Sequence, residues 1–293
     1  MTVAQDAAFC SLAVDSNQKP HISYVDRGAT KDSRIRYAHW DGTSWQQTII
    51  PVKDGVAYYT SIALDKNDFP QISFFDNLSP DGSGVLRLRV LSWNGKYWGL
   101  RTVDGEPGTG PLNALALDTA GHSHIAYASF AKDHTGLRYA YSDGEKWTTE
   151  IVDGMAAGKI RYISSLAIAL DKENRPHIAY TDAANQAIKY AVRVDGKWQV
   201  QVVARVADSA AADRSGIALD DRGNPYISFY DAGLGALKMA VLKGKEWTID
   251  TVEENSSGFS SSLQLAHDAI WVTYAGEKGG GLKIASKELR QIN

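Results

Sequence analysis

Ser61-Ile-Ala-Leu-Asp65, followed shortly by Gln71-Ile-Ser-Phe74, is the stretch that decides the fold, because the chain carries six copies of this pattern. In five copies the short apolar run ends in aspartate. The last residues of the six runs are Asp15, Asp65, Asp118, Asp171, Asp220 and Ala266. They lie 50, 53, 53, 49 and 46 residues apart. Self-similarity at such a period is typical of a repeat architecture.

Each copy contains the same four strand-like segments. After the apolar run, a second segment alternates polar and apolar residues, as in His21-Ile-Ser-Tyr24. A third segment such as Ile35-Arg-Tyr37 leads to a glycine turn and a tryptophan, as in Asp41-Gly42 to Trp45, and a fourth segment follows. Alternation at period two, β-branched and aromatic residues and Asp-Gly turns predict strands. Four short antiparallel strands per copy predict an all-β, six-bladed β-propeller.

Two repeated residue types predict how the blades pack. A small residue begins the first strand of every copy, where six inner strands converging on one axis leave little room. These residues are Ser11, Ser61, Ala114, Ala167, Gly216 and Ser262. The tryptophan after each glycine turn is predicted to be a packing anchor between blades.

The two ends of the sequence predict how the ring closes. The sixth copy stops at Asn293, where its tryptophan and fourth strand are expected, and Thr2-Val3-Ala4 resembles the end of a fourth strand such as Thr251-Val252. The N-terminal segment is therefore predicted to complete the last blade and to remove an exposed sheet edge. An open β-solenoid would explain neither end. The expected single domain covers residues 1–293, with blades at about 11–60, 61–113, 114–166, 167–215, 216–261, and 262–293 plus 1–10.

Composition excludes several classes of partner. The net charge is −3 and the isoelectric point is near 6.2, so the chain has no overall attraction for nucleic acid or an anionic membrane. No apolar run approaches the ~18 residues of a membrane span, and the first ten residues lack the pattern of a signal peptide. The single Cys10 excludes an internal disulfide and a cysteine-based zinc site. The sequence predicts no metal and no cofactor, and it leaves the oligomeric state open.

The glycine turn followed by tryptophan resembles, distantly, the Asp-box of sialidase-type propellers. The aspartate and glycine are adjacent here, as in Asp143-Gly144, whereas an Asp-box separates them, and the sialidase Arg-Ile-Pro element is absent. Over all six copies the chain resembles the Ser-Leu-Ala-Leu-Asp and Pro-His-Ile-Ser-Tyr-Tyr-Asp repeats of bacterial proteins. That resemblance implies the propeller fold and a secreted or cell-surface location, but no single activity.

The loops predict where a ligand binds. The turns between first and second strands and between third and fourth strands are short and regular. The other connections, on the opposite face, are long and differ in every blade. Varied loops on a rigid scaffold are where binding usually occurs. The sequence therefore predicts a site on the loop face, at the mouth of the central channel.

A charge pattern supplies the first candidate residues. The second position of the third strand is basic in all six copies: Arg36, Arg89, Arg138, Lys189, Lys238 and Lys283. Four second strands end in aspartate: Asp26, Asp76, Asp182 and Asp231. One interpretation is a repeated cross-strand ion pair. Ser129 and Gly276 replace the aspartate in blades three and six, so Arg138 and Lys283 are predicted to lack a local partner. Each cation is then either free to bind a carboxylate, sulfate or phosphate, or simply solvated.

Further candidates precede first strands or lie on variable loops. The aromatic and basic residues predicted to surround the channel entrance are Tyr58, Tyr59, Arg161, Tyr162, Arg214 and Phe259. Such residues suit sugar binding, and the alternative is that the aromatic rings cap the blades. His134 is a candidate acid or base because of its place on a loop.

Three functions remain open from the sequence. The favoured one is a non-catalytic, lectin-like propeller that binds a glycan or another small molecule, because no catalytic motif is present. The first alternative is a glycan-active enzyme, either a hydrolase or a lyase, with its site at the same channel mouth. The second is a protein-interaction scaffold, which would need a broad apolar patch.

Overall fold

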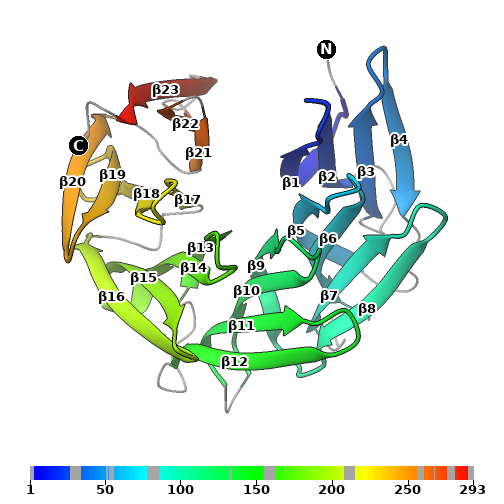
Figure 1. Cartoon of the computed structure of the whole chain (residues 1–293), viewed down its shortest axis with the longest axis horizontal. Coiled ribbons are helices and arrows are strands. Elements are labelled where there is room, and N and C mark those ends of the chain that lie inside the picture. Colours follow the sequence, from blue (N-terminus) through cyan, green and yellow to red (C-terminus); the bar gives the residue numbers. More distant parts are fainter. Residues whose placement is uncertain are drawn as a thin grey trace. The chain divides into compact units, whose positions relative to one another are not determined.

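The computed structural model describes residues 3–26, 34–50, 52, 56–77, 86–131, 134–154, 163–207, 215–255, 261–266, 268–275 and 281–289. The chain divides into two compact units, Met1–Gly154 and Met155–Asn293. Each unit contains three antiparallel sheets, which follow one another in chain order within the unit (Figure 1). The predicted fold class, an all-β six-bladed propeller with mostly four strands per blade, is confirmed.

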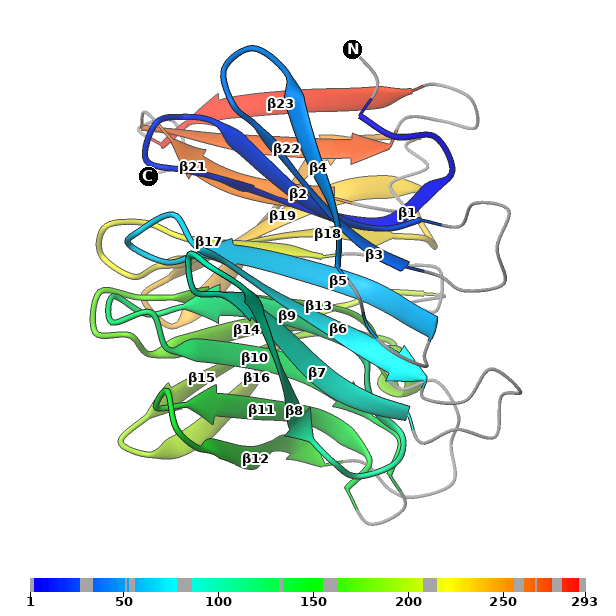
Figure 2. The same ribbon diagram turned by 90° about the vertical axis from the view of Figure 1, so that its right-hand side faces the viewer.

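The sheets of the first unit each have four strands. They are β1 (Ala7–Val14), β2 (Pro20–Asp26), β3 (Arg34–Trp40) and β4 (Trp45–Ile50); β5 (Val56–Leu64), β6 (Pro70–Asn77), β7 (Leu86–Trp93) and β8 (Trp98–Asp104); and β9 (Thr109–Leu117), β10 (Ser123–Ser129), β11 (Gly136–Ser142) and β12 (Trp147–Gly154). Within this unit, β5–β8 lies beside β9–β12 (Figure 2).

The second unit has two four-stranded sheets and one three-stranded sheet. They are β13 (Ile163–Leu170), β14 (Pro176–Asp182), β15 (Ala187–Val194) and β16 (Lys197–Arg205); β17 (Gly216–Leu219), β18 (Pro225–Asp231), β19 (Ala236–Lys243) and β20 (Glu246–Glu253); and β21 (Ser261–Ala266), β22 (Ala269–Ala275) and β23 (Leu282–Glu288). A single 3₁₀ turn, η1 (Ala183–Asn185), joins β14 to β15. No helix in the described part of the chain is long and apolar enough to cross a membrane.

The short turns are built by one repeated contact. In five of the six blades, the aspartate after the first strand accepts backbone hydrogen bonds from the second and fourth residues after it. Asp118 Oδ1, for example, accepts from Ala120 at 2.9 Å and from His122 at 2.8 Å. A side chain that replaces backbone acceptors in this way fixes a tight turn. These aspartates therefore fix the short turns between first and second strands. The turns belong to the rigid scaffold, on the face opposite the variable loops.

Tryptophan packs neighbouring blades together, as the sequence predicts. The Trp98 ring of the second sheet lies edge-on against Tyr37 of the first, with ring centroids 5.5 Å apart. In the second unit, Trp247 of β20 lies against Tyr190 of β15 in the same way, at 5.4 Å. Edge-to-face aromatic pairs add to the stabilisation gained by burial alone.

The predicted closing strand from Thr2-Val3-Ala4 is not formed in the described residues. Val3 and Ala4 belong to no strand, Thr2 lies outside the described residues, and the last sheet consists of β21–β23. The Val3 carbonyl instead accepts a hydrogen bond from Gln47 Nε2 of β4 at 2.8 Å. This contact satisfies a backbone acceptor that strand pairing would have used.

Candidate functional site

The structure places the predicted site residues in four different settings. Arg161, Tyr162 and Arg214, together with Phe259, lie outside the described residues. Tyr58 and Tyr59 form part of an aromatic cluster. Arg138 and His134 are brought together, and Lys283 belongs to the other unit.

Tyr58 and Tyr59 of β5 pack against other aromatic rings. The Tyr59 ring lies 4.4 Å from that of Phe9, and the Tyr58 ring lies 6.4 Å from that of Phe75. Tyr59 has a left-handed backbone, with φ of 52°, where the β5–β6 register shifts. These contacts agree with the interpretation that the two rings cap the blades.

Arg138 is paired, which corrects the prediction of an unpartnered cation. Its guanidinium lies 3.0 Å from Asp104 Oδ2 and 3.5 Å from Glu106 Oε2, and it donates to Thr149 Oγ1 at 3.0 Å. The side chain is only 7% exposed. The Asp104 carboxylate comes from the end of β8 in the preceding blade, 34 residues away. In the blade of Arg138 itself, Ser129 stands where other second strands end in aspartate.

Lys283 is paired in an equivalent way, so the second half of that prediction is also wrong. Its ammonium bonds to Glu253, at the end of β20 in the preceding blade, and the Tyr274 hydroxyl donates to the same carboxylate. These bonds hold the pKa of Glu253 below its usual value. The sequence contained a signal for both pairs. Asp104 and Glu253 occupy the same position at the end of a fourth strand, and each lies in the blade that precedes one without an aspartate at the end of its second strand.

The ordinary cross-strand pairs form in the other blades where the sequence places them. Arg36 pairs with Asp26 and Arg89 pairs with Asp76, each at 2.6 Å, and Lys189 pairs with Asp182 at 2.7 Å. The fourth expected aspartate, Asp231, accepts a hydrogen bond from the backbone of Leu234 at 3.3 Å. The interpretation as repeated ion pairs is confirmed for these three blades.

Around Arg138, five side chains form what we call the Glu106 cluster: Asp104, Glu106, Tyr127, His134 and Arg138. The Tyr127 hydroxyl donates to Asp104 Oδ2 at 2.7 Å, and His134 Nδ1 lies 2.9 Å from Glu106 Oε2. Burial, reinforced by the Asp104 carboxylate, raises the pKa of Tyr127 well above its usual value. Asp104, Tyr127 and Arg138 are buried, whereas Glu106 and His134 are partly exposed above them.

Two connected loops hold the outer layer of the Glu106 cluster in place. Asp104 Oδ1 accepts the backbone N–H of Glu106 at 3.0 Å, and Thr109 Oγ1 donates to the Glu106 carbonyl at 2.9 Å. The second loop is tied to the first where the Phe130 backbone N–H donates to the Gly108 carbonyl at 2.9 Å. Both loops lie on the face that the sequence predicted for binding.

Phe130, Asp104, Glu106 and Tyr127 are residues that sequence reasoning missed. Phe130 directly follows β10 and is 44% exposed, beside the loop that carries Glu106. An exposed aromatic ring next to paired acceptors and donors offers a sugar both a stacking face and hydroxyl partners. With two carboxylates facing one guanidinium, the cluster presents more negative than positive charge, so it favours a neutral ligand over an anionic one.

A second arrangement looks catalytic but is structural. In three blades a buried histidine of the second strand bonds a tyrosine hydroxyl through Nδ1 at 2.6 Å, and its Nε2 lies 3.3–3.7 Å from the turn aspartate. The three sets are Asp15–His21–Tyr37, Asp118–His124–Tyr139 and Asp171–His177–Tyr190. All three histidines are buried on strands that form the blade cores. The repetition of one buried arrangement in three blades fits a scaffold role.

These histidines are expected to make the free energy of unfolding depend on pH. Burial lowers the pKa of His21, His124 and His177, outweighing the attraction of their aspartates. The unfolded chain, with a histidine pKa of about 6.5, then binds more protons, so the free energy of unfolding should fall as pH drops below about 6.5. Each histidine can contribute at most about 1.4 kcal/mol per pH unit.

Urea denaturation at pH 7.5 and 5.5 measures this loss. His177→Gln should lose less stability between these pH values than the wild type, because the variant lacks one of the buried titrating groups. Glutamine is a suitable replacement, since Gln71 occupies the equivalent position in the second blade. An equal loss in both proteins would show that the buried histidine does not contribute.

No protein-family profile matches this sequence, and no curated protein matches it. Among solved structures, the intramolecular trans-sialidase from Ruminococcus gnavus, in complex with oseltamivir carboxylate, is similar with a TM-score of 0.69 and 11% identity, over 97% of this chain and 95% of that one. A protein of unknown function from Dyadobacter fermentans is similar with a TM-score of 0.64 and 15% identity, over 96% and 93% of the chains. The α-L-arabinanase from Penicillium chrysogenum, complexed with arabinobiose, is similar with a TM-score of 0.61 and 10% identity, over 98% and 94%. At these identities the similarities show a shared fold.

Proposed function

We propose that this protein is a lectin-like propeller that binds a neutral carbohydrate at the Glu106 cluster and the adjacent Phe130. The observation that carries the proposal is the layered arrangement. Partly exposed Glu106 and His134 bond to each other above the buried Asp104–Arg138 pair, and an exposed aromatic ring lies beside them. Similarity to a trans-sialidase and an arabinanase, each solved with a ligand, supports a carbohydrate-related role.

The layering gives the site a physical rationale. Buried Arg138 and Tyr127 fix Asp104, and Arg138 also lies 3.5 Å from Glu106, so the outer carboxylate is oriented before a ligand arrives. Preorganisation of this kind lowers the entropy lost on binding. A sugar hydroxyl donating to Glu106 would make a charge-assisted hydrogen bond, which is stronger than one between neutral groups.

The test is a glycan-array screen, followed by calorimetry on the best glycan. Glu106→Gln and Phe130→Ala should each weaken binding about tenfold or more, through loss of a charged hydrogen bond and of a stacking face. Matched controls are Glu145→Gln in the third blade and Tyr97→Ala, both exposed in the short turns of the other face. Equal affinity of all four variants would contradict the proposal.

A glycan-active enzyme is the second candidate, and one observation favours it. The buried carboxylate of Asp104 and the exposed carboxylate of Glu106 both pair with the Arg138 guanidinium. When two carboxylates have different environments, one can act as the acid and the other as the base. Recovery of the bound glycan distinguishes the two functions. Intact glycan supports binding alone, and cleaved glycan that Glu106→Gln fails to produce supports an enzyme.

A further inference from the structure

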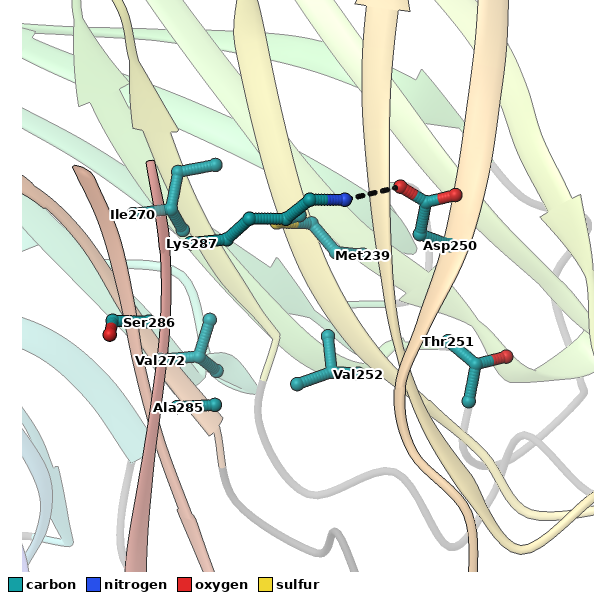
Figure 3. A pocket seen from close by; sticks show the side chains of 9 residues that line it. All are labelled: Met239, Asp250, Thr251, Val252, Ile270, Val272, Ala285, Ser286 and Lys287. Atoms are coloured by element: carbon teal, nitrogen blue, oxygen red, sulfur yellow. Dashed lines mark hydrogen bonds and ion pairs between the residues drawn. The ribbon is translucent and has the colours of Figure 1, made fainter. Parts of the chain in front are cut away.

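A hollow of about 180 Å³ lies in the second unit between β20 and β23. Its apolar wall includes Met239, Val252, Ile270 and Ala285, and Asp250 and Lys287 form a 3.4 Å ion pair across one side (Figure 3). A cavity of about 150 Å³ with apolar walls is large enough to hold benzene. The hollow is therefore large enough to accept much of an aromatic side chain, and its open side can leave the rest outside.

At the equivalent place between other blades, a tryptophan fills this space. Trp247 lies against Tyr190 of the preceding blade and donates its indole N–H to Gln201 Oε1 at 3.2 Å. Tyr190 and Gln201 are cross-strand partners in their blade. In the next blade the corresponding partners are Met239 and Asp250, and both line the hollow.

The register of β23 indicates where a tryptophan of an added fourth strand would lie, namely over the hollow. In β19, Met239 is followed three residues later by Leu242, whose cross-strand partner is Trp247. In β23 the residue equivalent to Met239 is Ile284, and three residues later comes Lys287, which lines the hollow. A residue paired opposite Lys287 would therefore lie over the hollow.

β23 is also the edge of its sheet in the described part of the chain, since it pairs there with β22 alone. An apolar edge strand with open backbone groups is a template for a further strand.

We propose that this hollow is a socket for a tryptophan carried by an extended peptide segment of a partner, which adds to β23 as a fourth strand. Backbone hydrogen bonds to β23 would supply affinity, and the socket would select the aromatic side chain. The indole N–H would donate to Asp250, as Trp247 donates to Gln201. The Asp250–Lys287 pair is exposed, so it costs little to rearrange. This inference is independent of the proposed glycan site.

The probe is a synthetic peptide with the sequence of residues 146–153, Lys-Trp-Thr-Thr-Glu-Ile-Val-Asp, labelled for fluorescence anisotropy. It should bind the whole protein, and the same peptide with Trp147→Ala should bind at least about tenfold more weakly, because a buried aromatic anchor is lost. Ala285→Phe, which fills the socket, should weaken peptide binding to a similar extent. Leu234→Phe adds similar bulk on an exposed turn between β18 and β19, outside the hollow, so this variant should bind the peptide like the wild type.

Equal binding of the two peptides would show strand pairing without a socket and would overturn the proposal. If neither peptide binds at millimolar concentration, the proposal is also overturned, because the edge of β23 would then be covered by the chain itself or by a second copy. If Ala285→Phe does not fold, the comparison of the two peptides on the wild type still decides the question.

Discussion

Arg138→Met is expected to lower the free energy of unfolding by about 3 kcal/mol, measured by urea denaturation at pH 7. The substitution keeps the apolar stem of the side chain but removes the guanidinium that faces Asp104 and Glu106. Asp104 is buried, so its carboxylate would be left with only the Tyr127 hydroxyl and a backbone N–H. Removing one partner of a buried pair is costly because the other charge stays desolvated.

Lys283→Met is the matched control, because Lys283 has the same place and a similar role in the sixth blade. Its pair with Glu253 is partly exposed to solvent, so its loss should cost less than about 1 kcal/mol. Adding Asp104→Asn to Arg138→Met should recover part of the lost stability, since the uncompensated charge is then gone. A loss in Arg138→Met no larger than in Lys283→Met would contradict the burial argument.

Because Arg138 belongs to a buried ion pair, it is not a suitable position for testing the glycan site. Arg138→Ala would remove a structural ion pair, so loss of binding in that variant would not identify a ligand contact. Glu106 and Phe130 are better positions, because both are exposed to a ligand and neither is buried in the blade. The buried side chain positions the exposed one and need not itself contact a sugar.

Gly216→Ala is expected to destabilise the protein by about 3 kcal/mol, measured in the same way. An added Cβ would lie 2.8 Å from the backbone nitrogen of Leu263 in β21 and 2.8 Å from Ser228 Oγ in β18. Backbone atoms on one side and a buried hydrogen-bonded hydroxyl on the other leave little room for movement. Overpacking of a close-packed interior typically costs 1–3 kcal/mol, and here a strand must shift.

Gly99→Ala provides the control for this substitution. Its added Cβ would meet only the Ser92 carbonyl oxygen, at an ordinary 3.7 Å, and its backbone is not left-handed. Alanine there reduces the entropy of the unfolded chain, so stability should be unchanged or slightly higher. If Gly216→Ala is as well tolerated as Gly99→Ala, close approach of β17 to β21 is not what requires glycine.

The repeated small residues of the first strands, such as Ser11, Ser61 and Gly216, show what the repeat alone can and cannot predict. In the structure, β1 and β5 begin at Ala7 and Val56, before these positions. The sequence predicts limited space at these positions, and Gly216 confirms it with a specific neighbour, Leu263. The structure adds a polar role: Ser11 Oγ accepts the Ile62 backbone N–H at 3.2 Å, and Ser61 Oγ accepts that of Leu115 at 3.1 Å. Each hydroxyl links one blade to the next, which no single copy of the repeat reveals.

The sequence by itself determined the strands, the turn chemistry, the six blades and the ion pairs inside a blade. These features join residues at short, repeated spacings, such as Arg36 with Asp26, so periodicity alone makes them visible. Only the tertiary structure decided that Arg138 is paired with Asp104, that Glu106, His134 and Phe130 share one surface, and that a hollow lies beside β23. Those contacts cross from one blade to the next, over about thirty residues or more in the case of the ion pairs. Which residues meet in these contacts depends on how neighbouring sheets pack and on the conformation of loops that differ from blade to blade. The spacing of the repeat encodes neither.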